Sequence, residues 1–220
     1  MAQQLTFDLP VRESRSRGDF FVSDANALAL ARLDDPSTWP NRKLVLVGPE
    51  GAGKSHLAHV WAEQVGARLL EPEALKTLDI PGIDHPVALD RADALSPGAE
   101  ELVFHLHNHL GASALPFLLV SRTPPARWDL TLPDLKSRMA ATDSVRIDGP
   151  DDALLAAVMV KQFSDRQLVV PPLVIDWLVR HMDRSFAEAR RLVEALDRAA
   201  LAEGKAITRP LAQKVLSESR

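Results

Sequence analysis

The chain has 220 residues, of which 46% are hydrophobic and 25% are charged, and its formal net charge is −4. This composition is typical of a soluble globular protein of one large domain, or one domain with a small appendage, and we expect a cytoplasmic protein without membrane contact. The lack of cysteine excludes disulfides, zinc–thiolate sites and thiol catalysis, and the mild acidity argues against DNA as the main partner.

The first 18 residues predict a flexible N-terminal tail. Residues 12–18 are polar and charged without apolar periodicity, which is typical of a solvated linker. Before them lies the isolated segment Gln4–Leu9 (QLTFDL), with three large apolar side chains. Such a segment suits either a docking peptide that becomes ordered on a partner or a short strand packed on its own domain.

The folded part is expected to open at residues 20–22, with the sequence FFV. A helix is predicted at 25–33 and a turn at 39–41. The apolar run 44–47 (LVLV) then predicts the first buried strand.

The segment Gly48–Ser55 (GPEGAGKS) connects this strand to a stretch of helical periodicity. Glycines let consecutive backbone N–H groups curl around phosphate oxygens, and the helix N-terminus adds partial positive charge. Lys54 can reach the outer phosphates, while the Ser55 hydroxyl can bind Mg²⁺. The motif in this context predicts a nucleotide-binding protein.

Strand and helix signals alternate after the phosphate loop, which predicts a parallel sheet covered on both faces. The first helix is expected to end at Gly66, a common residue after a helix C-terminus. Further strands are expected at 68–70, 86–90, 117–121 and 145–147, and helices at 72–78 and 97–110, the latter closed by Gly111.

The strand at 86–90 ends in Asp90. In P-loop proteins an aspartate at this place lies beside the phosphates and holds Mg²⁺ through water. We therefore expect Ser55 and Asp90 to hold the metal ion together.

Only helix signals follow Pro150. They cover 151–163, 172–181, 185–202 and 208–216, and the third begins with the capping-box pattern SFAE at 185–188. We expect an α/β protein with three parts: a tail at 1–18, a P-loop nucleotide-binding α/β domain at 19–149 and an all-α lid subdomain at 150–220.

Three histidines, His105, His107 and His109, invite a metal-site interpretation. On a helix the first and third share a face, the second points nearly opposite, and no carboxylate completes a site. A solvated or half-buried helix is the better interpretation.

These motifs together resemble the AAA+ ATPase module of the DnaA family of bacterial replication initiators, and most closely its short Hda-type regulators. The likeness covers essentially the whole chain, including the segment Leu132–Arg138 (LPDLKSR) after the fourth strand. It implies a P-loop AAA+ module with a helical lid that binds ADP or ATP with Mg²⁺. The residues implied in nucleotide binding are Phe21, Val22, Gly48, Gly51, Ala52, Gly53, Lys54, Ser55 and His56.

The resemblance also implies partners. Segment Gln4–Leu9 is similar to the hexapeptide that docks on the sliding clamp, the beta subunit of DNA polymerase III, and implies that Gln4, Leu5, Phe7 and Leu9 make the contact. Arg138, which the residues alone leave as either a surface arginine or an arginine finger, falls at the finger position. The implied function is regulation of replication initiation by promoting ATP hydrolysis by DnaA, with direct DNA contact at most weak and self-association as a further option.

One departure from the family pattern concerns catalysis. Arg91 stands after Asp90, where an active AAA+ ATPase carries an acid that orients water. The absence of this acid removes a major contributor to hydrolysis but leaves phosphate binding intact. We expect weak or no intrinsic ATPase activity.

Two further departures concern the residues that sense the nucleotide. The first sensor position falls at Ser121 or Arg122, and the sensor-2 arginine of the lid aligns with Ala187. Arg190 or Arg191 could replace it only with a different placement of the lid.

Two other functions fit a P-loop protein. A DnaA-like or loader-type ATPase that acts directly on DNA would bind DNA at low salt. A P-loop kinase would transfer phosphate to a small acceptor, although neither an arginine-rich lid nor an acceptor pocket is evident in the sequence.

Overall fold

The computed structural model describes residue 22 and residues 25–218. The predicted docking segment Gln4–Leu9 and the predicted nucleotide contact Phe21 lie outside these residues. None of the described helices is long and apolar enough to cross a membrane.

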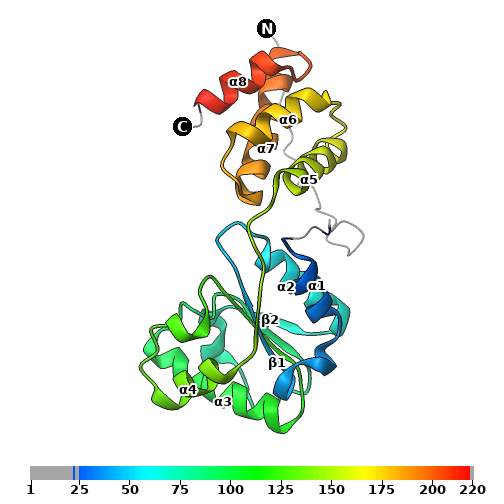
Figure 1. Ribbon diagram of the computed structural model, residues 1–220. Coiled ribbons are helices and arrows are strands. Elements are labelled where there is room, and N and C mark those ends of the chain that lie inside the picture. Colours follow the sequence, from blue (N-terminus) through cyan, green and yellow to red (C-terminus); the bar gives the residue numbers. More distant parts are fainter. Residues whose placement is uncertain (1–21, 23–24, 219–220) are drawn as a thin grey trace.

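Five parallel strands form one sheet in the order β2-β3-β4-β1-β5. Figure 1 shows this sheet in the lower part of the molecule. The two five-residue strands β1 and β4 pair along their whole length and are buried throughout. The strand bounds are β1 Lys43–Val47, β2 Arg68–Leu70, β3 Val87–Leu89, β4 Phe117–Ser121 and β5 Ser144–Arg146. The predicted parallel sheet is confirmed.

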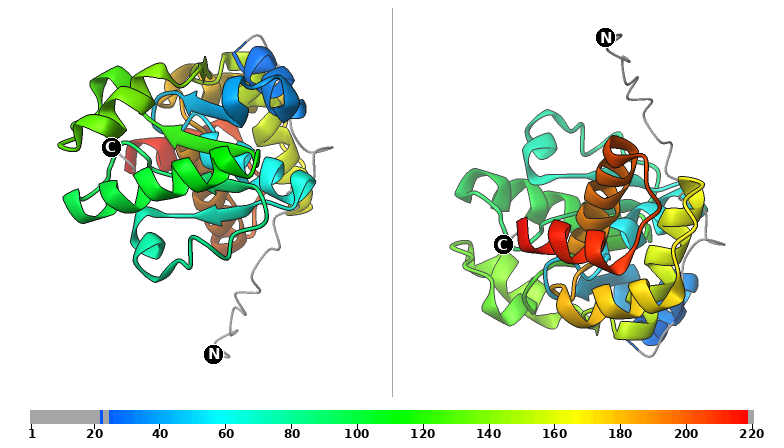
Figure 2. Two further views of the ribbon diagram at one scale, coloured as in Figure 1. Left: turned by 90° about the horizontal axis from the view of Figure 1, so that it is seen from below. Right: turned by 90° about the horizontal axis from the view of Figure 1, so that it is seen from above.

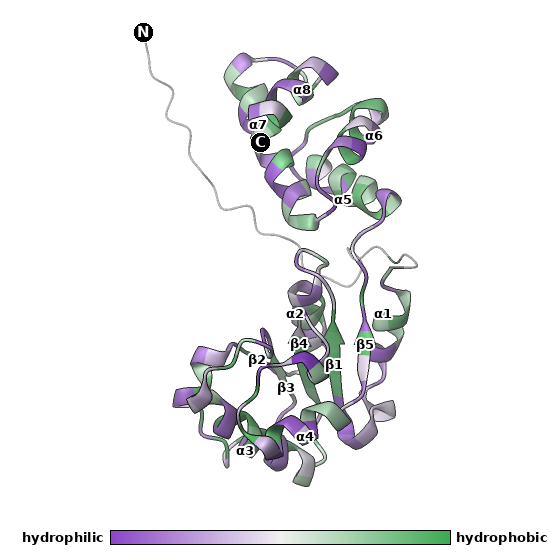
Figure 3. Ribbon diagram, turned by 60° about the vertical axis from the view of Figure 1, so that its left-hand side comes forward, coloured by the Kyte–Doolittle hydropathy of each residue, from purple (hydrophilic) through white to green (hydrophobic). Residues whose placement is uncertain are grey.

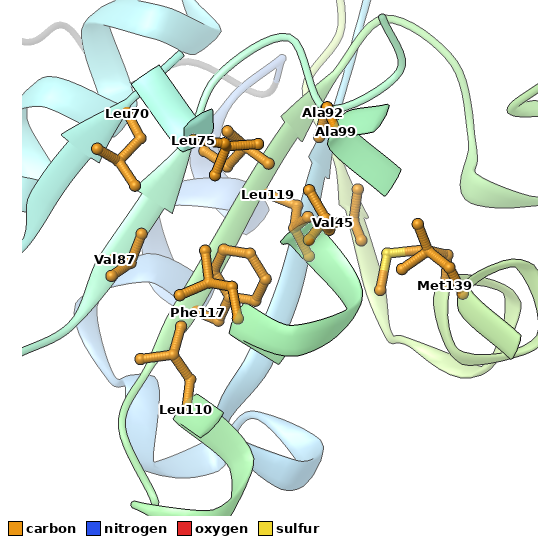
Figure 4. Packing of buried hydrophobic residues seen from close by; sticks show 14 of the residues in the cluster. Val45, Leu70, Leu75, Val87, Ala92, Ala99, Leu110, Phe117, Leu119 and Met139 are labelled. Atoms are coloured by element: carbon orange, nitrogen blue, oxygen red, sulfur yellow. The ribbon is translucent and has the colours of Figure 1, made fainter. Parts of the chain in front are cut away.

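Helices cover both faces of this sheet because successive side chains of a strand point to opposite faces. In β1, Val45 and Val47 pack with α3 and α4 on one face (Figure 4), while Leu44 and Leu46 pack with α1 and α2 on the other. The bounds of these helices are α1 Ala27–Asp34, α2 Lys54–Val65, α3 Pro97–Ala112 and α4 Pro133–Ala141.

Four helices follow the last strand and bury a hydrophobic cluster of their own. They form a layer above the sheet in Figure 1 and lie in front of it in the right-hand view of Figure 2. Figure 3 shows hydrophobic residues along β1 and mixed hydropathy along these four helices, as expected for a buried strand and for amphipathic helices. Their bounds are α5 Asp152–Asp165, α6 Pro172–His181, α7 Phe186–Glu203 and α8 Arg209–Glu218.

Tryptophan lies in two of the three hydrophobic clusters and packs against the third. Trp39 and Trp61 stack with ring centroids 5.5 Å apart in the cluster of α1 and α2. Trp128 lies in the cluster of α3 and α4, and Trp177 packs against the cluster of the C-terminal helices.

Three local predictions need correction. Residues Pro72–Thr77 form 3₁₀ turns, and α4 was not predicted. Gly111 does not close α3, which continues to Ala112. A Cβ atom on Gly111 would lie 2.8 Å from Nζ of Lys43, so this glycine makes room for a lysine side chain.

Candidate nucleotide-binding site

The phosphate loop runs from the end of β1 to the start of α2 at the carboxyl edge of the sheet. Its backbone at Gly51 and Gly53 has φ of 74° and 85°, a region that favours glycine. Gly48 N–H donates to the carbonyl of Ser121 (3.2 Å), which joins the loop to the end of β4. Ala52 is buried in the cluster of α1 and α2, so the loop is anchored to the core.

Lys54 begins α2 with only 8% of its surface exposed. Its ammonium donates a 2.8 Å hydrogen bond to the carbonyl of Pro49 in the same loop. Burial lowers the pKa of Lys54, and the nearby carboxylates of Asp90 and Asp93 act in the opposite direction. The loop therefore holds a cation inside its curve, where it suits the outer phosphates of a nucleotide.

Oxygen donors for Mg²⁺ come from two neighbouring elements. Ser55 lies in the first turn of α2 and is exposed, and half-buried Asp90 follows β3 directly. Hydroxyl and carboxylate oxygens fit Mg²⁺, which usually takes its other ligands from water and phosphates. No group of three His, Cys, Asp or Glu side chains in the described part of the chain could hold a metal alone.

Arg91 forms ion pairs with two carboxylates. Its backbone has φ of 52°, and its guanidinium lies 2.7 Å from Glu71 and 2.9 Å from Glu73, at the 3₁₀ turns after β2. The position that would carry a water-orienting acid thus holds a cation bound to two carboxylates. Sequence reasoning missed these partners, which lie 20 and 18 residues away along the chain.

Asp93 connects the end of β3 to the end of β4. Its Oδ2 accepts hydrogen bonds from the backbone N–H groups of Arg122 (2.8 Å) and Thr123 (3.2 Å). Ser121 is buried and donates its hydroxyl to the carbonyl of Thr123, whereas the guanidinium of Arg122 lies 3.1 Å from Glu50 of the phosphate loop. Of the two residues predicted at the first sensor position, Ser121 and Arg122, it is Arg122 that places a charge beside the phosphate loop.

The lid touches the phosphate loop at the N-terminus of α7. The backbone N–H of Phe186 donates to the carbonyl of Gly51 at 3.1 Å. A Cβ atom on Gly51 would lie 2.7 Å from Cβ of Ser185, and one on Gly53 would lie 3.1 Å from the Phe186 ring. Sequence reasoning did not identify Ser185 and Phe186 as parts of the site.

The sensor-2 region of the lid begins with half of a capping box. Ser185 Oγ accepts from the N–H of Glu188 (3.1 Å), but the Glu188 carboxylate binds Arg191 at 2.8 and 2.6 Å. Arg191 is therefore engaged within its own helix, Arg190 is exposed, and Ala187 is an exposed alanine.

Two further residues were predicted to contact the nucleotide, His56 and Val22. His56 is half-buried in the first turn of α2. Val22 has 68% of its surface exposed.

Arg138 lies on α4, away from the phosphate loop of its own chain. Its guanidinium lies over the ring of Phe104, 5.0 Å from the centroid, and its charge acts on Lys43 and His107. Lys43 opens β1, so it is separated from the loop by the strand length of about 16 Å. The structure brings the phosphate loop, Asp90 and the lid together, and it places Arg138 outside this group, exposed on α4.

Comparisons with known proteins agree with this arrangement. Residues 151–216 match the family model described as the lid domain of Hda. Among solved structures, domain III of the replication initiation protein DnaA from Thermotoga maritima superposes with a TM-score of 0.80 at 17% identity, covering 96% of this chain and 98% of that one. AMPPCP-bound DnaA from Aquifex aeolicus gives 0.70 at 20% identity, covering 88% and 68%.

A third structure with a similar fold comes from a different protein. The RuvB Holliday junction branch migration motor of Thermotoga maritima gives a TM-score of 0.63 at 18% identity, covering 80% and 61%. At these identities the likeness shows the fold. The chain has the fold of DnaA domain III, and its residues 151–216 match the lid domain of Hda.

Proposed function

We propose that this chain, with an Hda-type lid on a DnaA-like AAA+ module, regulates replication initiation by promoting ATP hydrolysis by DnaA. One observation carries the proposal. The phosphate loop is complete and in contact with the lid, while the position of the water-orienting acid holds Arg91, bound to Glu71 and Glu73. Such a site binds a nucleotide and lacks the acid that activates water.

The proposed resident nucleotide is ADP with Mg²⁺. Loop N–H groups and the Lys54 ammonium would bind the phosphates, with Ser55 and, through water, Asp90 at the metal. When bound, the metal ion supplies positive charge that neutralises the phosphate oxygens. The buried charge of Lys54, held by Pro49, supports this role.

The proposed docking partner is the sliding clamp, reached through the N-terminal tail. Gln4 can hydrogen-bond at one end of the segment, while Leu5, Phe7 and Leu9 fill an apolar pocket. Burying two or three such side chains contributes on the order of 4–8 kcal/mol before the cost of ordering the tail.

Arg138 is proposed as an arginine finger that acts on the nucleotide of DnaA. Its place on an exposed face of α4, remote from its own phosphate loop, supports action on a second molecule. An arginine finger increases the rate of hydrolysis by roughly 10³-fold or more.

The test separates docking from stimulation. Leu5→Ala with Phe7→Ala should lose clamp binding and keep ADP binding, whereas Arg138→Ala should keep both and fail to stimulate hydrolysis by DnaA on clamp-loaded DNA. Arg127→Ala, at another exposed arginine near α4, is the matched control and should stimulate normally. Normal stimulation by Arg138→Ala would refute the finger, and DNA-dependent ATP turnover by this protein alone would favour a loader-type ATPase.

A further inference from the structure

The finger candidate Arg138 rests on an aromatic ring. Its guanidinium carbon lies 5.0 Å from the centroid of Phe104, which belongs to α3. Phe104 is itself half-buried and packs against the hydrophobic cluster of α3 and α4. The ring is therefore a fixed platform for an otherwise exposed side chain.

No carboxylate holds Arg138 within the described part of the chain. In contrast, Arg32 pairs with Asp143 at 2.6 Å and Arg184 with Asp152 at 2.8 Å. A carboxylate partner would occupy N–H donors of the guanidinium and cancel its charge. Contact with the face of a ring leaves the donors and the charge available.

The positive charge of a buried lysine, Lys43, acts on Arg138. Lys43 is 7% exposed, and its Nζ lies 3.4 Å from Nδ1 of His107. Repulsion between Lys43 and Arg138 opposes an inward turn of the guanidinium. Attraction by the ring and repulsion by the lysine thus favour the same outward placement.

We propose that Phe104 is a positioning residue for Arg138, which holds the guanidinium ready for the phosphate oxygens of a neighbouring molecule's nucleotide. The inference rests on the proposed function of Arg138. A side chain that is already in place loses less rotamer freedom when it binds, so the gain should appear in the rate at saturation.

The test compares Phe104→Leu, which keeps apolar packing without the π face, with Phe104→Tyr, which keeps both. Phe104→Leu should lower the rate of DnaA hydrolysis at saturating protein roughly two- to fivefold, the range that an exposed cation–π contact supports. The half-saturating concentration and ADP binding should be unchanged, and Phe104→Tyr should restore the rate. In an Arg138→Ala background, Phe104→Leu should have no further effect.

A second measurement keeps this inference separate from the finger assignment. In the protein alone, the side-chain NMR signals of Arg138 should show a ring-current shift that disappears in Phe104→Leu. Absence of that shift in the unmodified protein would overturn the positioning role whatever the hydrolysis assay shows. A rate loss that persists in the Arg138→Ala background would overturn it too, because the ring would then act independently of the arginine.

Discussion

The backbone N–H of Phe186 donates a 3.1 Å hydrogen bond to the carbonyl of Gly51. This bond links the first residue of the lid helix α7 to the middle of the phosphate loop. A movement of the loop on nucleotide binding would therefore displace α7. A movement of the lid would likewise displace the loop that is expected to bind the phosphates.

The first prediction concerns Ser185, which caps α7 and packs against Gly51. Ser185→Ala should lower the free energy of unfolding by about 1 kcal/mol, because the N–H of Glu188 loses its acceptor. Urea unfolding measures the change. Ser96→Ala is the matched control, since Ser96 precedes α3 without a side-chain cap and should change stability by no more than a few tenths of a kcal/mol. Equal losses in both variants would contradict the cap.

Lys54→Ala should abolish ADP binding, because it removes the cation held inside the phosphate loop. Calorimetry measures binding directly, and thermal unfolding provides a second readout. At 100 times the dissociation constant, ADP should stabilise the unmodified protein by about 2.7 kcal/mol and leave the variant unchanged. Lys76→Ala, at an exposed lysine, should bind like the unmodified protein. Equal binding by Lys54→Ala would refute the assignment of the loop.

The purified protein should show negligible ATPase activity, because Arg91 is bound to Glu71 and Glu73 where an acid would orient water. A phosphate-release assay tests this. Turnover of about 1–10 per second, the usual enzyme order, would contradict the prediction. Asp93, which faces the same edge of the sheet, would then be the first residue to replace.

Glu100 should be a large contributor to stability. It is 1% exposed, and its carboxylate accepts hydrogen bonds from the N–H groups of Thr131 (3.0 Å) and Leu132 (2.7 Å). Glu100→Ala should lower the free energy of unfolding by about 2–3 kcal/mol, and Glu100→Gln by less, because the amide oxygen still accepts. The exposed neighbour Glu101→Ala should have almost no effect in the same urea titration.

Stability should fall as the pH drops from about 6.5 toward 4. Burial, with the charges of Lys43 and Arg138, lowers the pKa of His107 from 6.5 to about 4. Between these two pH values the histidine is protonated in the unfolded chain but not in the folded protein. The contribution of His107 to the free energy of unfolding is therefore complete above pH 6.5 and is lost on acidification. It amounts to roughly 3 kcal/mol at most.

His107→Gln should flatten this part of the pH profile, because glutamine does not titrate. His105→Gln provides the control, since His105 is exposed on the same helix. A profile that remains as steep in His107→Gln as in the unmodified protein would assign the acid sensitivity to other groups.

Elements with a strong local signal could be predicted from the sequence. Continuous apolar runs predicted β1 and β4 to within a residue, and α6 has the predicted bounds, from Pro172 to His181. Helix α4 was missed because only Leu135 and Met139 of its nine residues are buried, which leaves too little apolar periodicity to detect.

Contacts between distant residues could not be predicted in this way. The pairs Arg91–Glu71 and Arg138–Phe104, and the hydrogen bond from Phe186 to Gly51, join segments that no periodicity relates. His107 was expected on a solvated or half-buried helix face, but it is 6% exposed, and its Nδ1 lies 3.4 Å from Nζ of Lys43. The loop between β1 and α2 could be predicted because its sequence motif is contiguous in the chain.

The distribution of tryptophan supplies optical probes for this molecule. Three different hydrophobic clusters are in contact with tryptophan: one with Trp39 and Trp61, one with Trp128 and one with Trp177. If the tryptophans at two of the clusters are replaced by phenylalanine, the remaining fluorescence reports on the third cluster alone. The chain has no cysteine, so a single introduced cysteine would carry the only thiol-reactive dye. Excitation transfer from Trp177 to a dye on the sheet side would then follow the lid in real time as ADP is added.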